Sequence, residues 1–331
     1  MAEVTLRGVS KRFGATRAVR DVTMTVPDGA FMVLLGPTGA GKTTILRLIA
    51  GLETADAGAL GIGGRDVGAL TPAQRDVAMV FQQYSLYPHM SVRDNLAFPL
   101  RSPVLRTPEP EIARRVDQVA EMLQIAHKLD NKATALSGGE MQRVSIGRAL
   151  VRSPAAFLMD EPLSSLDAKL RSDLRVELKA IQANTGATFL YVTHDQIEAM
   201  TMATHVGVLD AGRLVQVGSP REVYENPVSV YAAARLGQPR INVLPADVFP
   251  GAPAEARFIG LRPEQIHEGE GQPAEVRRIE RLGDQTRLHL ALAGHDIVTV
   301  TDAHTALRTG DVIDIRPERP FWFGADGARI A

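Results

Sequence analysis

The sequence predicts an α/β fold with a mainly parallel sheet, followed by a small β domain. Apolar strands and amphipathic helices alternate over most of the chain, and polar residues gather where those strands end. Open α/β sheets hold their sites at that edge. After residue 236 the pattern changes to short alternating strands between turn residues, which is typical of a β-barrel. We therefore expect two domains in the 331 residues, spanning 1–236 and 237–331.

The composition narrows the classes of function. Lys and Arg number 37 and Asp and Glu number 38, so the formal net charge is -1 and no global basic field exists to hold nucleic acid. The chain has no cysteine, which excludes disulfides, thiol nucleophiles and thiolate metal sites. Residues 1–7 lack the apolar core of a signal peptide, and no apolar run approaches the roughly 20 residues that span a bilayer.

A glycine-rich loop lies between the first buried strand and the first helix. Residues 31–35 are continuously apolar, which predicts a fully buried strand. Apolar residues at helical spacing over 45–49 predict a helix that ends at Gly51 as its C-terminal cap. A loop in this setting has the context that phosphate binding requires.

The loop from Gly36 to Thr43 matches the phosphate-loop pattern. Its glycines let successive N–H groups point at phosphate oxygens, and the following helix N-terminus adds a favourable dipole. We expect Lys42 to reach the β- and γ-phosphates and the Thr43 hydroxyl to ligate Mg²⁺. The alternative is an ordinary glycine turn before a helix. The expected nucleotide-binding residues here are Gly36, Pro37, Thr38, Gly39, Ala40, Gly41, Lys42, Thr43 and Thr44.

Two later buried strands end in side chains suited to phosphoryl transfer. The strand over 155–159 ends at Asp160 and Glu161, and the strand over 189–192 is followed by His194. Phosphoryl transfer to water needs charge neutralisation and a carboxylate aimed at the nucleophile. We assign Asp160 to Mg²⁺ through its water shell and Glu161 to the attacking water as general base. The alternatives are a solvated pair of turn carboxylates and a structural histidine.

Gln82 and Phe13 are candidate nucleotide-site residues only because the other motifs are present in the same chain. The side-chain carbonyl of Gln82 can ligate Mg²⁺ or orient a water, although most glutamines simply lie on the surface. Phe13 offers a flat face on which a base can stack. Taken alone, Phe13 is better explained as a core or hairpin aromatic.

The stretch Leu136-Ser137-Gly138-Gly139-Glu140 predicts a second anion-binding turn at a helix N-terminus. One nucleotide rarely needs two separate phosphate-binding loops in the same chain. Since each motif occurs once, a symmetric dimer that holds each nucleotide between two chains would use both loops.

Together these motifs resemble the ATP-binding subunit of an ABC transporter, in that family's order, over residues 1 to about 236. The matching motifs are Walker A (36–44), the Q-loop glutamine (Gln82), the signature (136–140), Walker B with its catalytic glutamate (157–161), the D-loop (164–167) and the switch histidine (His194). The resemblance implies an ATP-hydrolysing P-loop core with antiparallel β and helical subdomains. It also implies a head-to-tail dimer, which is expected to be a homodimer, with two sandwiched ATP molecules.

The resemblance assigns a role to each matching residue. Lys42, Gln82, Glu161 and His194 would be catalytic, and Thr43, Gln82 and Asp160 would hold Mg²⁺. Besides the phosphate loop, the nucleotide contacts would come from Phe13, Ser137, Gly138, Gly139 and Asp167. Glu140 departs from the commoner glutamine of the signature, which should leave the Ser137 and Gly139 contacts intact.

The resemblance also implies partners and a location. Residues about 88–150 would form a helical subdomain that receives the coupling helices of two membrane permease subunits, and 81–89 resembles the contact region in carbohydrate importers. An external solute-binding protein would act indirectly, and no nucleic acid is expected. The chain would sit peripherally on the cytoplasmic face of the bacterial inner membrane.

The tail sharpens the class of solute. Residues 218–227 and 260–264 resemble the carbohydrate-importer subgroup that includes the maltose transporter ATPase, with its OB-like regulatory domain. The expected function is ATP-driven uptake of a sugar or sugar derivative. The alternatives are import of glycerol phosphate, polyamine, sulfate or iron, and a soluble ATPase acting on DNA or ribosomes. A non-hydrolysing regulator would have no need of Glu161 and His194.

Overall fold

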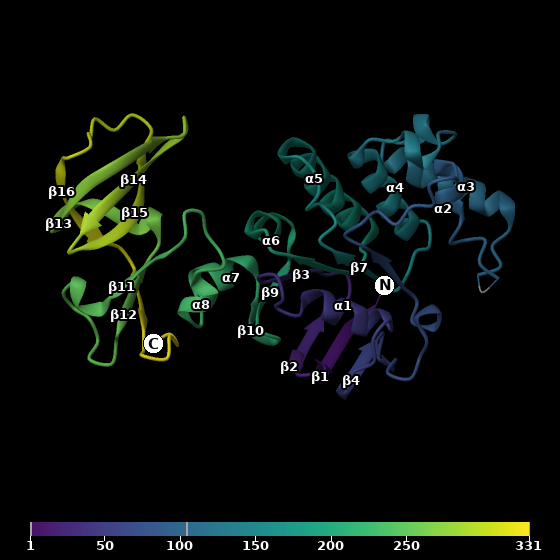
Figure 1. Ribbon diagram of the computed structural model, residues 1–331, viewed down its shortest axis with the longest axis horizontal. Helices are drawn as coiled ribbons and strands as arrows, with labels where there is room; N and C mark the ends of the chain where they lie inside the picture. The colour runs from purple at the N-terminus through teal and green to yellow at the C-terminus, as the bar shows by residue number, and fades with distance from the viewer. Residues whose placement is uncertain (1, 104, 331) are drawn as a thin grey trace. The chain divides into compact units, whose positions relative to one another are not determined.

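The computed structural model describes residues 2–103 and 105–330 (Figure 1). Over these residues the chain forms two compact units that divide after Pro220. The sequence placed the domain boundary later, after residue 236, where prolines and glycines become frequent. That stretch instead carries strand β11 (Asn242–Pro245) of the second unit. Proline and glycine there shape turns within a fold rather than a linker between folds.

The first unit contains two sheets. In the order in which they pair, the antiparallel sheet consists of β2 (Thr16–Val26), β1 (Val4–Phe13), β4 (Ala57–Ile62) and β5 (Arg65–Asp66). The second sheet consists of β10 (Arg213–Gly218), β9 (His205–Asp210), β3 (Phe31–Leu35), β8 (Phe189–Thr193), β7 (Ala156–Asp160) and β6 (Val77–Val80). All its neighbours pair in parallel except β10 with β9, so the predicted mainly parallel sheet is confirmed.

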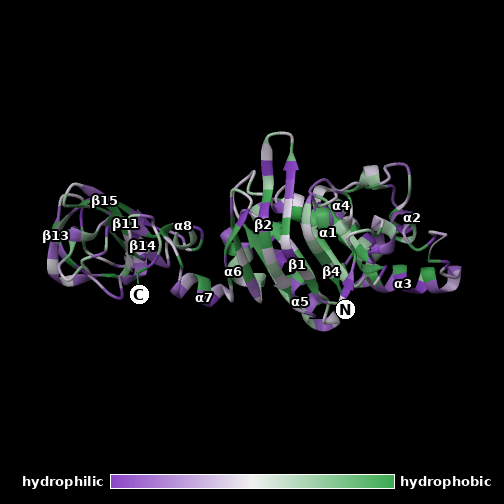
Figure 2. Cartoon of the chain, turned by 90° about the horizontal axis from the view of Figure 1, so that it is seen from below, coloured by the Kyte–Doolittle hydropathy of each residue, from purple (hydrophilic) through white to green (hydrophobic). Residues whose placement is uncertain are grey.

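Helix α1 (Lys42–Ala50) joins the two sheets into one core. Its side chains Ile45, Leu46, Leu48 and Ile49 are fully buried against strands of both sheets. Each such side chain stabilises the fold by about 1.5–3 kcal/mol relative to an exposed position. The helix ends as predicted at Gly51, whose left-handed backbone lets its N–H meet the last carbonyls. Figure 2 shows hydrophobic and hydrophilic residues alternating along β1 and β2, which cover this helix.

Further helices of the first unit lie between residues 88 and 150 and beside the parallel sheet. Between residues 88 and 150 lie α2 (Val92–Ala97), α3 (Glu109–Met122) and α4 (Gly138–Leu150), which are grouped together in Figure 1. The sheet is flanked by α5 (Ala168–Thr185) and α6 (Gln196–Met202). In the described part of the chain, no helix is long and apolar enough to cross a membrane.

The second unit is built from antiparallel strands, as predicted for its OB-like class. After α7 (Pro220–Glu225) and α8 (Val230–Ala233), one sheet pairs β11, β12 (Phe258–Leu261) and β17 (Phe321–Phe323). The other pairs β15 (His295–Asp302), β14 (Gln285–Leu292), β13 (Ile266–Arg281) and β16 (Val312–Pro317). Along β14 every second residue is buried, so one face of that strand covers the core.

Arg262 explains why residues 221–236 belong to the second unit. Its guanidinium donates to the backbone carbonyls of Tyr224 and Ala233 at 2.9 Å each, and also to that of Leu236. The side chain is completely buried directly after β12. Because three carbonyls of the α7–α8 segment depend on one arginine, this segment folds with the β strands that follow it.

Candidate functional site

Strand register brings the predicted site residues to one edge of the parallel sheet. Leu35 at the end of β3 pairs with Thr193 of β8, and Asp160 at the end of β7 pairs with Val192. The phosphate loop, Glu161 and His194 therefore follow three adjacent strands. Carboxyl ends of parallel strands meet at the same edge, which is where α/β folds place their ligands.

The glycine-rich loop is held close to neighbouring backbone. Gly41 precedes α1 in a left-handed conformation with φ 98°, and a Cβ placed there would lie 2.3 Å from the carbonyl oxygen of Ala18. No residue with a side chain fits this position. The tight approach leaves the first N–H groups of α1 facing the loop, and a helix N-terminus in that arrangement attracts phosphate.

Lys42 is buried beside its own loop, with only 4% of its surface exposed. Its ammonium donates to the carbonyl oxygens of Gly36 at 2.8 Å and Pro37 at 3.0 Å. It also lies 3.3 Å from Oε1 of Glu161. A phosphate that binds this ammonium would have to replace one or more of these three partners.

Thr43 and Asp160 form a pair of oxygen ligands. The Thr43 hydroxyl donates to Oδ1 of Asp160 at 2.8 Å. Burial raises the pKa of the Asp160 carboxyl, the Thr43 hydrogen bond acts against that rise, and the nearby Glu161 charge adds to it. A cation bound here would favour the ionised carboxylate through charge attraction, which acts against the effect of burial.

Glu161 and His194 lie in direct contact. Nδ1 of His194 is 3.0 Å from Oε2 of Glu161, while the other carboxylate oxygen faces Lys42. Glu161 has a positive φ of 44°, a conformation seldom adopted by a residue with a side chain. The backbone around it is fixed, because its N–H donates to Val192 and its carbonyl accepts from the Ser164 hydroxyl. Strained backbone of this kind is concentrated at functional sites.

The signature loop opens α4 with a capping box. Ser137 is the N-cap, and both its N–H and its hydroxyl donate to Oε2 of Glu140, at 2.8 and 2.9 Å. The Glu140 carboxylate also pairs with Lys128 at 3.1 Å. Gly139 packs so closely against α5 that a Cβ would lie 2.2 Å from Cδ2 of Leu170. Because position 140 holds glutamate in place of the commoner glutamine, Ser137 hydrogen-bonds a charged carboxylate.

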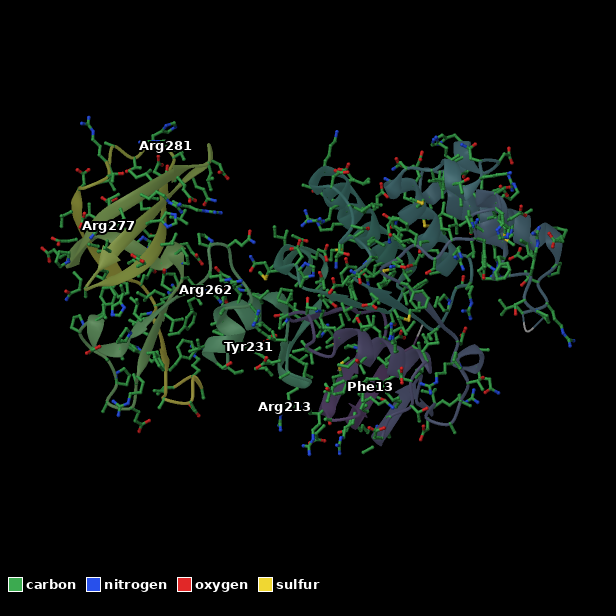
Figure 3. The ribbon with its side chains drawn as sticks, viewed as in Figure 1. Phe13, Arg213, Tyr231, Arg262, Arg277 and Arg281 are labelled. Carbon is green, nitrogen blue, oxygen red and sulfur yellow. The ribbon has the colours of Figure 1, made fainter. Side chains whose placement is uncertain are left out.

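The structure does not bring every predicted residue together within one chain. Gln82 lies exposed in the loop after β6, and Phe13 lies 45% exposed at the β1–β2 hairpin (Figure 3). The Asp167 carboxylate caps α5 by accepting from the N–H of Leu170 at 3.0 Å. Ser137 is engaged in the first turn of its own helix. These residues would meet a nucleotide only through movement or through a second chain.

Sequence reasoning gave Tyr84 no role of its own within the 81–89 segment. Its hydroxyl lies 3.1 Å from Oγ of Ser165, in the D-loop, and a Cβ on Gly138 would approach it to 3.3 Å. Tyr84 therefore connects the segment after Gln82 with both the signature and the D-loop. The sequence signal for Tyr84 is its place in the 81–89 segment that resembles the importer contact region, whereas the contact with Ser165 depends on tertiary packing.

Phe13 gives a test of nucleotide stacking. Phe13→Ala is expected to weaken ATP binding by about 1–3 kcal/mol, the usual cost of losing one base–aromatic stack. Lys11, whose ammonium lies 5.3 Å from the ring centroid, keeps its charge in this variant. Titration with a fluorescent ATP analogue measures the change, with Phe98→Ala, another exposed aromatic of the first unit, as control. Equal ATP affinity of Phe13→Ala and Phe98→Ala would mean that Phe13 has only a structural role.

These features define a nucleotide-binding protein of the P-loop class. Residues 19–164 match the ABC transporter family, and residues 259–323 match the TOBE domain. The chain is 42% identical to the sn-glycerol-3-phosphate import ATP-binding protein UgpC of Ralstonia nicotianae, over 99% of this chain and 98% of that one. It is 45% identical to the protein of the same name from Ruegeria pomeroyi, over 89% and 88%.

Solved structures agree with these sequence relatives. An ATP-binding cassette of an ABC transporter in its ADP conformation superimposes with a TM-score of 0.61 and 28% identity, over 69% of this chain and 96% of that one. CbiO1 of Clostridium perfringens gives 0.63 and 26%, over 67% and 90%. This chain belongs to the ATP-binding proteins of the ABC transporter family. It accordingly binds and hydrolyses ATP.

Proposed function

We propose that this chain is the ATP-hydrolysing subunit of an importer for a sugar derivative, with sn-glycerol 3-phosphate as the candidate solute. The observation that supports this most directly is the match along essentially the whole chain, through both units, to proteins named for import of that compound. The four candidate groups Lys42, Thr43, Glu161 and His194 supply a site suited to phosphoryl transfer. A different solute remains compatible with the same ATPase.

In the proposed reaction, Glu161 accepts a proton from the attacking water. Its two oxygens contact Lys42 and His194, the two other residues proposed to meet the γ-phosphate, which supports this role. When ATP enters, Lys42 exchanges the Gly36 and Pro37 carbonyls for phosphate oxygens, since a charged oxygen binds an ammonium more strongly than a carbonyl does. Release from Lys42 frees Glu161 to take up water, while His194 contacts the γ-phosphate.

Mg²⁺ fits the Thr43–Asp160 pair. A hydroxyl and a carboxylate 2.8 Å apart offer the hard oxygen ligands that this ion prefers, and it normally takes the rest of its shell from water and substrate phosphates. The described residues hold no group of three or more His, Cys, Asp and Glu side chains that could form a protein-only cage. When bound, the ion neutralises charge on the β- and γ-phosphates. Gln82 would complete the site only after moving inward.

A second copy of the chain would complete the nucleotide site. Ser137, Gly138 and Gly139 make their described contacts within α4 and with Tyr84 and α5, and none of those contacts involves the phosphate loop. A head-to-tail homodimer would place each signature loop across from the partner's phosphate loop. Ser137 would then exchange its Glu140 contact for a phosphate oxygen, and Asp167 would approach the same interface from the start of α5.

A groove on the helical part of the first unit is suited to a permease helix. It has a volume of about 240 Å³ and is lined by Phe81, Tyr84, Phe98 and Arg148, among others. Phe81 and Phe98 are exposed, and the guanidinium of Arg148 lies 5.0 Å from the centroid of the Tyr87 ring. Tyr84 lines the groove, and its hydroxyl also contacts Ser165 of the D-loop. A helix bound in the groove would therefore contact the D-loop through a single side chain, that of Tyr84.

Phe98→Asp tests the groove. The substitution removes an exposed apolar ring and adds a charge that has to be desolvated on docking, so capture of the two permease subunits should fall at least about tenfold, while ATP affinity stays unchanged. Val176→Asp is the matched control, because Val176 is an apolar side chain 70% exposed on α5, outside the groove. Permease capture that survives Phe98→Asp, or that fails equally in Val176→Asp, would reject the groove as the docking surface.

The function itself is tested by purifying tagged Glu161→Gln protein with ATP and Mg²⁺ from solubilised native membranes. Two polytopic permease subunits among the captured proteins, identified by mass spectrometry, would establish a transporter. The solute-binding protein expressed with them is then screened against sn-glycerol 3-phosphate, maltose and a polyamine. Binding of a different solute would change the substrate assignment, and recovery of soluble or nucleic-acid partners alone would overturn the transport proposal.

A further inference from the structure

The second unit contains a polar cavity that no step of ATP hydrolysis uses. Its volume is about 510 Å³, within the range of about 300–1,000 Å³ that small-molecule sites occupy. Three arginines, Arg262, Arg319 and Arg329, line it together with Gln265 and two glutamates. Figure 3 labels Arg262 near Tyr231 of α8. The three guanidinium groups bring three positive charges to this cavity, so the groups that offset them decide which ligand it can bind.

Arg262 carries a buried positive charge whose described contacts are all with neutral groups. Its two terminal nitrogens donate to three backbone carbonyls, and its guanidinium lies 3.9 Å from the centroid of the Tyr224 ring. Its Nε is buried and has no hydrogen-bond partner among the described residues. The Glu264 carboxylate acts on Arg262 through its charge, and no direct ion pair joins the two among the described residues. A buried charge without a hydrogen-bonded ion partner is costly, and an anion in the adjoining cavity would lower that cost.

The other two arginines bring further positive charge to the same cavity. Arg329 donates from Nη1 to Oδ1 of Asn226 at 3.2 Å and lies 5.0 Å from the centroid of the Phe321 ring, and both partners are neutral. Arg319 is 83% exposed in its side chain and lies 3.8 Å from Glu318, a loose contact. Both guanidinium groups can turn toward an anion without breaking a close ion pair.

The two carboxylates of the lining do not cancel this charge. Glu225 pairs with Arg221 at 2.9 Å, and Glu264 accepts a hydrogen bond from the Tyr224 hydroxyl. Arg221 offsets the charge of Glu225, whereas Glu264 keeps its negative charge because the Tyr224 hydroxyl is neutral. Three guanidinium groups therefore face one carboxylate whose charge is not offset from outside the lining. The surplus in the cavity is positive, so an anionic ligand is favoured over a cation or a neutral molecule.

Gln265 adds a requirement for a hydrogen-bond donor. Its Oε1 is buried and has no hydrogen-bond partner among the described residues, although the side chain lines the cavity. A buried acceptor without a partner costs about 1–3 kcal/mol, which a ligand hydroxyl would recover. The ligand that satisfies the cavity thus carries anionic oxygens for the arginines and at least one hydroxyl for Gln265.

We propose that this cavity binds a small hydroxylated oxyanion of the phosphate class. Guanidinium groups match the tetrahedral oxygens of phosphate geometrically, and the volume leaves room for a short hydroxylated chain beside it. The ligand's source is either free hydrogen phosphate or a phosphate ester of a small polyol. The site is distinct from the nucleotide site, and its occupancy can be measured whether or not the transport proposal holds.

Calorimetric titration of the full-length protein tests the proposal. Inorganic phosphate, glycerol 3-phosphate and glycerol are titrated separately, each with excess Mg²⁺–ADP present to occupy the phosphate loop. Arg319→Gln and Arg329→Gln remove one charge each from the cavity. Arg277→Gln removes a charge from β13, outside the lining, where Arg277 pairs with Glu275 at 3.0 Å. Unchanged thermal midpoints establish that all variants are folded.

We expect binding of at least one oxyanion to wild type and to Arg277→Gln, and binding about tenfold or more weaker in both cavity variants, as for loss of a hydrogen bond to a charged group. Tighter binding of glycerol 3-phosphate than of phosphate would identify the ester as the ligand, and the reverse order would identify free phosphate. The proposal is overturned if neither oxyanion binds, if glycerol binds equally well, or if the cavity variants retain wild-type affinity.

Discussion

Glu161→Gln is expected to slow steady-state ATP hydrolysis by about 10²–10⁴-fold, the contribution of a positioned general base. Glutamine keeps the size of the side chain and one oxygen for the contact with His194, but its amide cannot accept a proton from water. ATP binding should survive, because the phosphate-facing groups Lys42 and Thr43 are untouched. The two steps, binding and turnover, would therefore separate in this variant.

The Glu161→Gln variant should also differ from wild type in its oligomeric state. With ATP and Mg²⁺ the variant should accumulate as a closed dimer, seen by light scattering, because only hydrolysis would reopen it. Glu121→Gln on the exposed side of α3 is the matched control and should retain wild-type turnover and remain monomeric or in rapid exchange. Near wild-type turnover in Glu161→Gln would refute Glu161 as the base and direct attention to Asp160.

The sequence was sufficient for features that depend on local pattern. Residues 31–35 could be predicted to be a buried strand because every side chain in the run is apolar, and Gly51 could be predicted to end α1 because a left-handed cap favours glycine. The phosphate loop followed from its position between those two elements. In each case the determining interactions lie within a few residues of the motif.

Features set by contacts between distant segments could not be predicted. The unit boundary at Pro220 depends on Arg262, which lies beyond the segment that it holds. The Tyr84–Ser165 contact joins positions 81 residues apart, and no periodicity encodes it. The capping box formed by Ser137 and Glu140 is local, yet Glu140 was interpreted from the sequence only as a departure from glutamine, and it was not predicted that its carboxylate would accept from Ser137.

Removal of the Lys42 ammonium should have the second large effect. Lys42→Ala is expected to weaken ATP binding by about 1.5–3 kcal/mol, the usual worth of a hydrogen bond to a charged group, or roughly 10- to 150-fold. The Lys42 ammonium is the one cation of the phosphate loop, and it lies 3.3 Å from Oε1 of Glu161. It is the group expected to contact the β- and γ-phosphates. Titration with a fluorescent ATP analogue measures the loss, and Arg65→Ala, an exposed cation of the same unit, should bind normally.

Lys42 also has partners inside the protein, so its variant has to be separated from simple unfolding. Alanine leaves the Gly36 and Pro37 carbonyls without their buried donor, which should lower the thermal midpoint even without nucleotide. Lys42→Arg keeps the charge and can still donate to those carbonyls, so it should recover stability more fully than affinity, because guanidinium is larger than the space that ammonium fills. ATP affinity that stays at the wild-type level in folded Lys42→Ala protein would mean that Lys42 acts on the loop's backbone and not on phosphate.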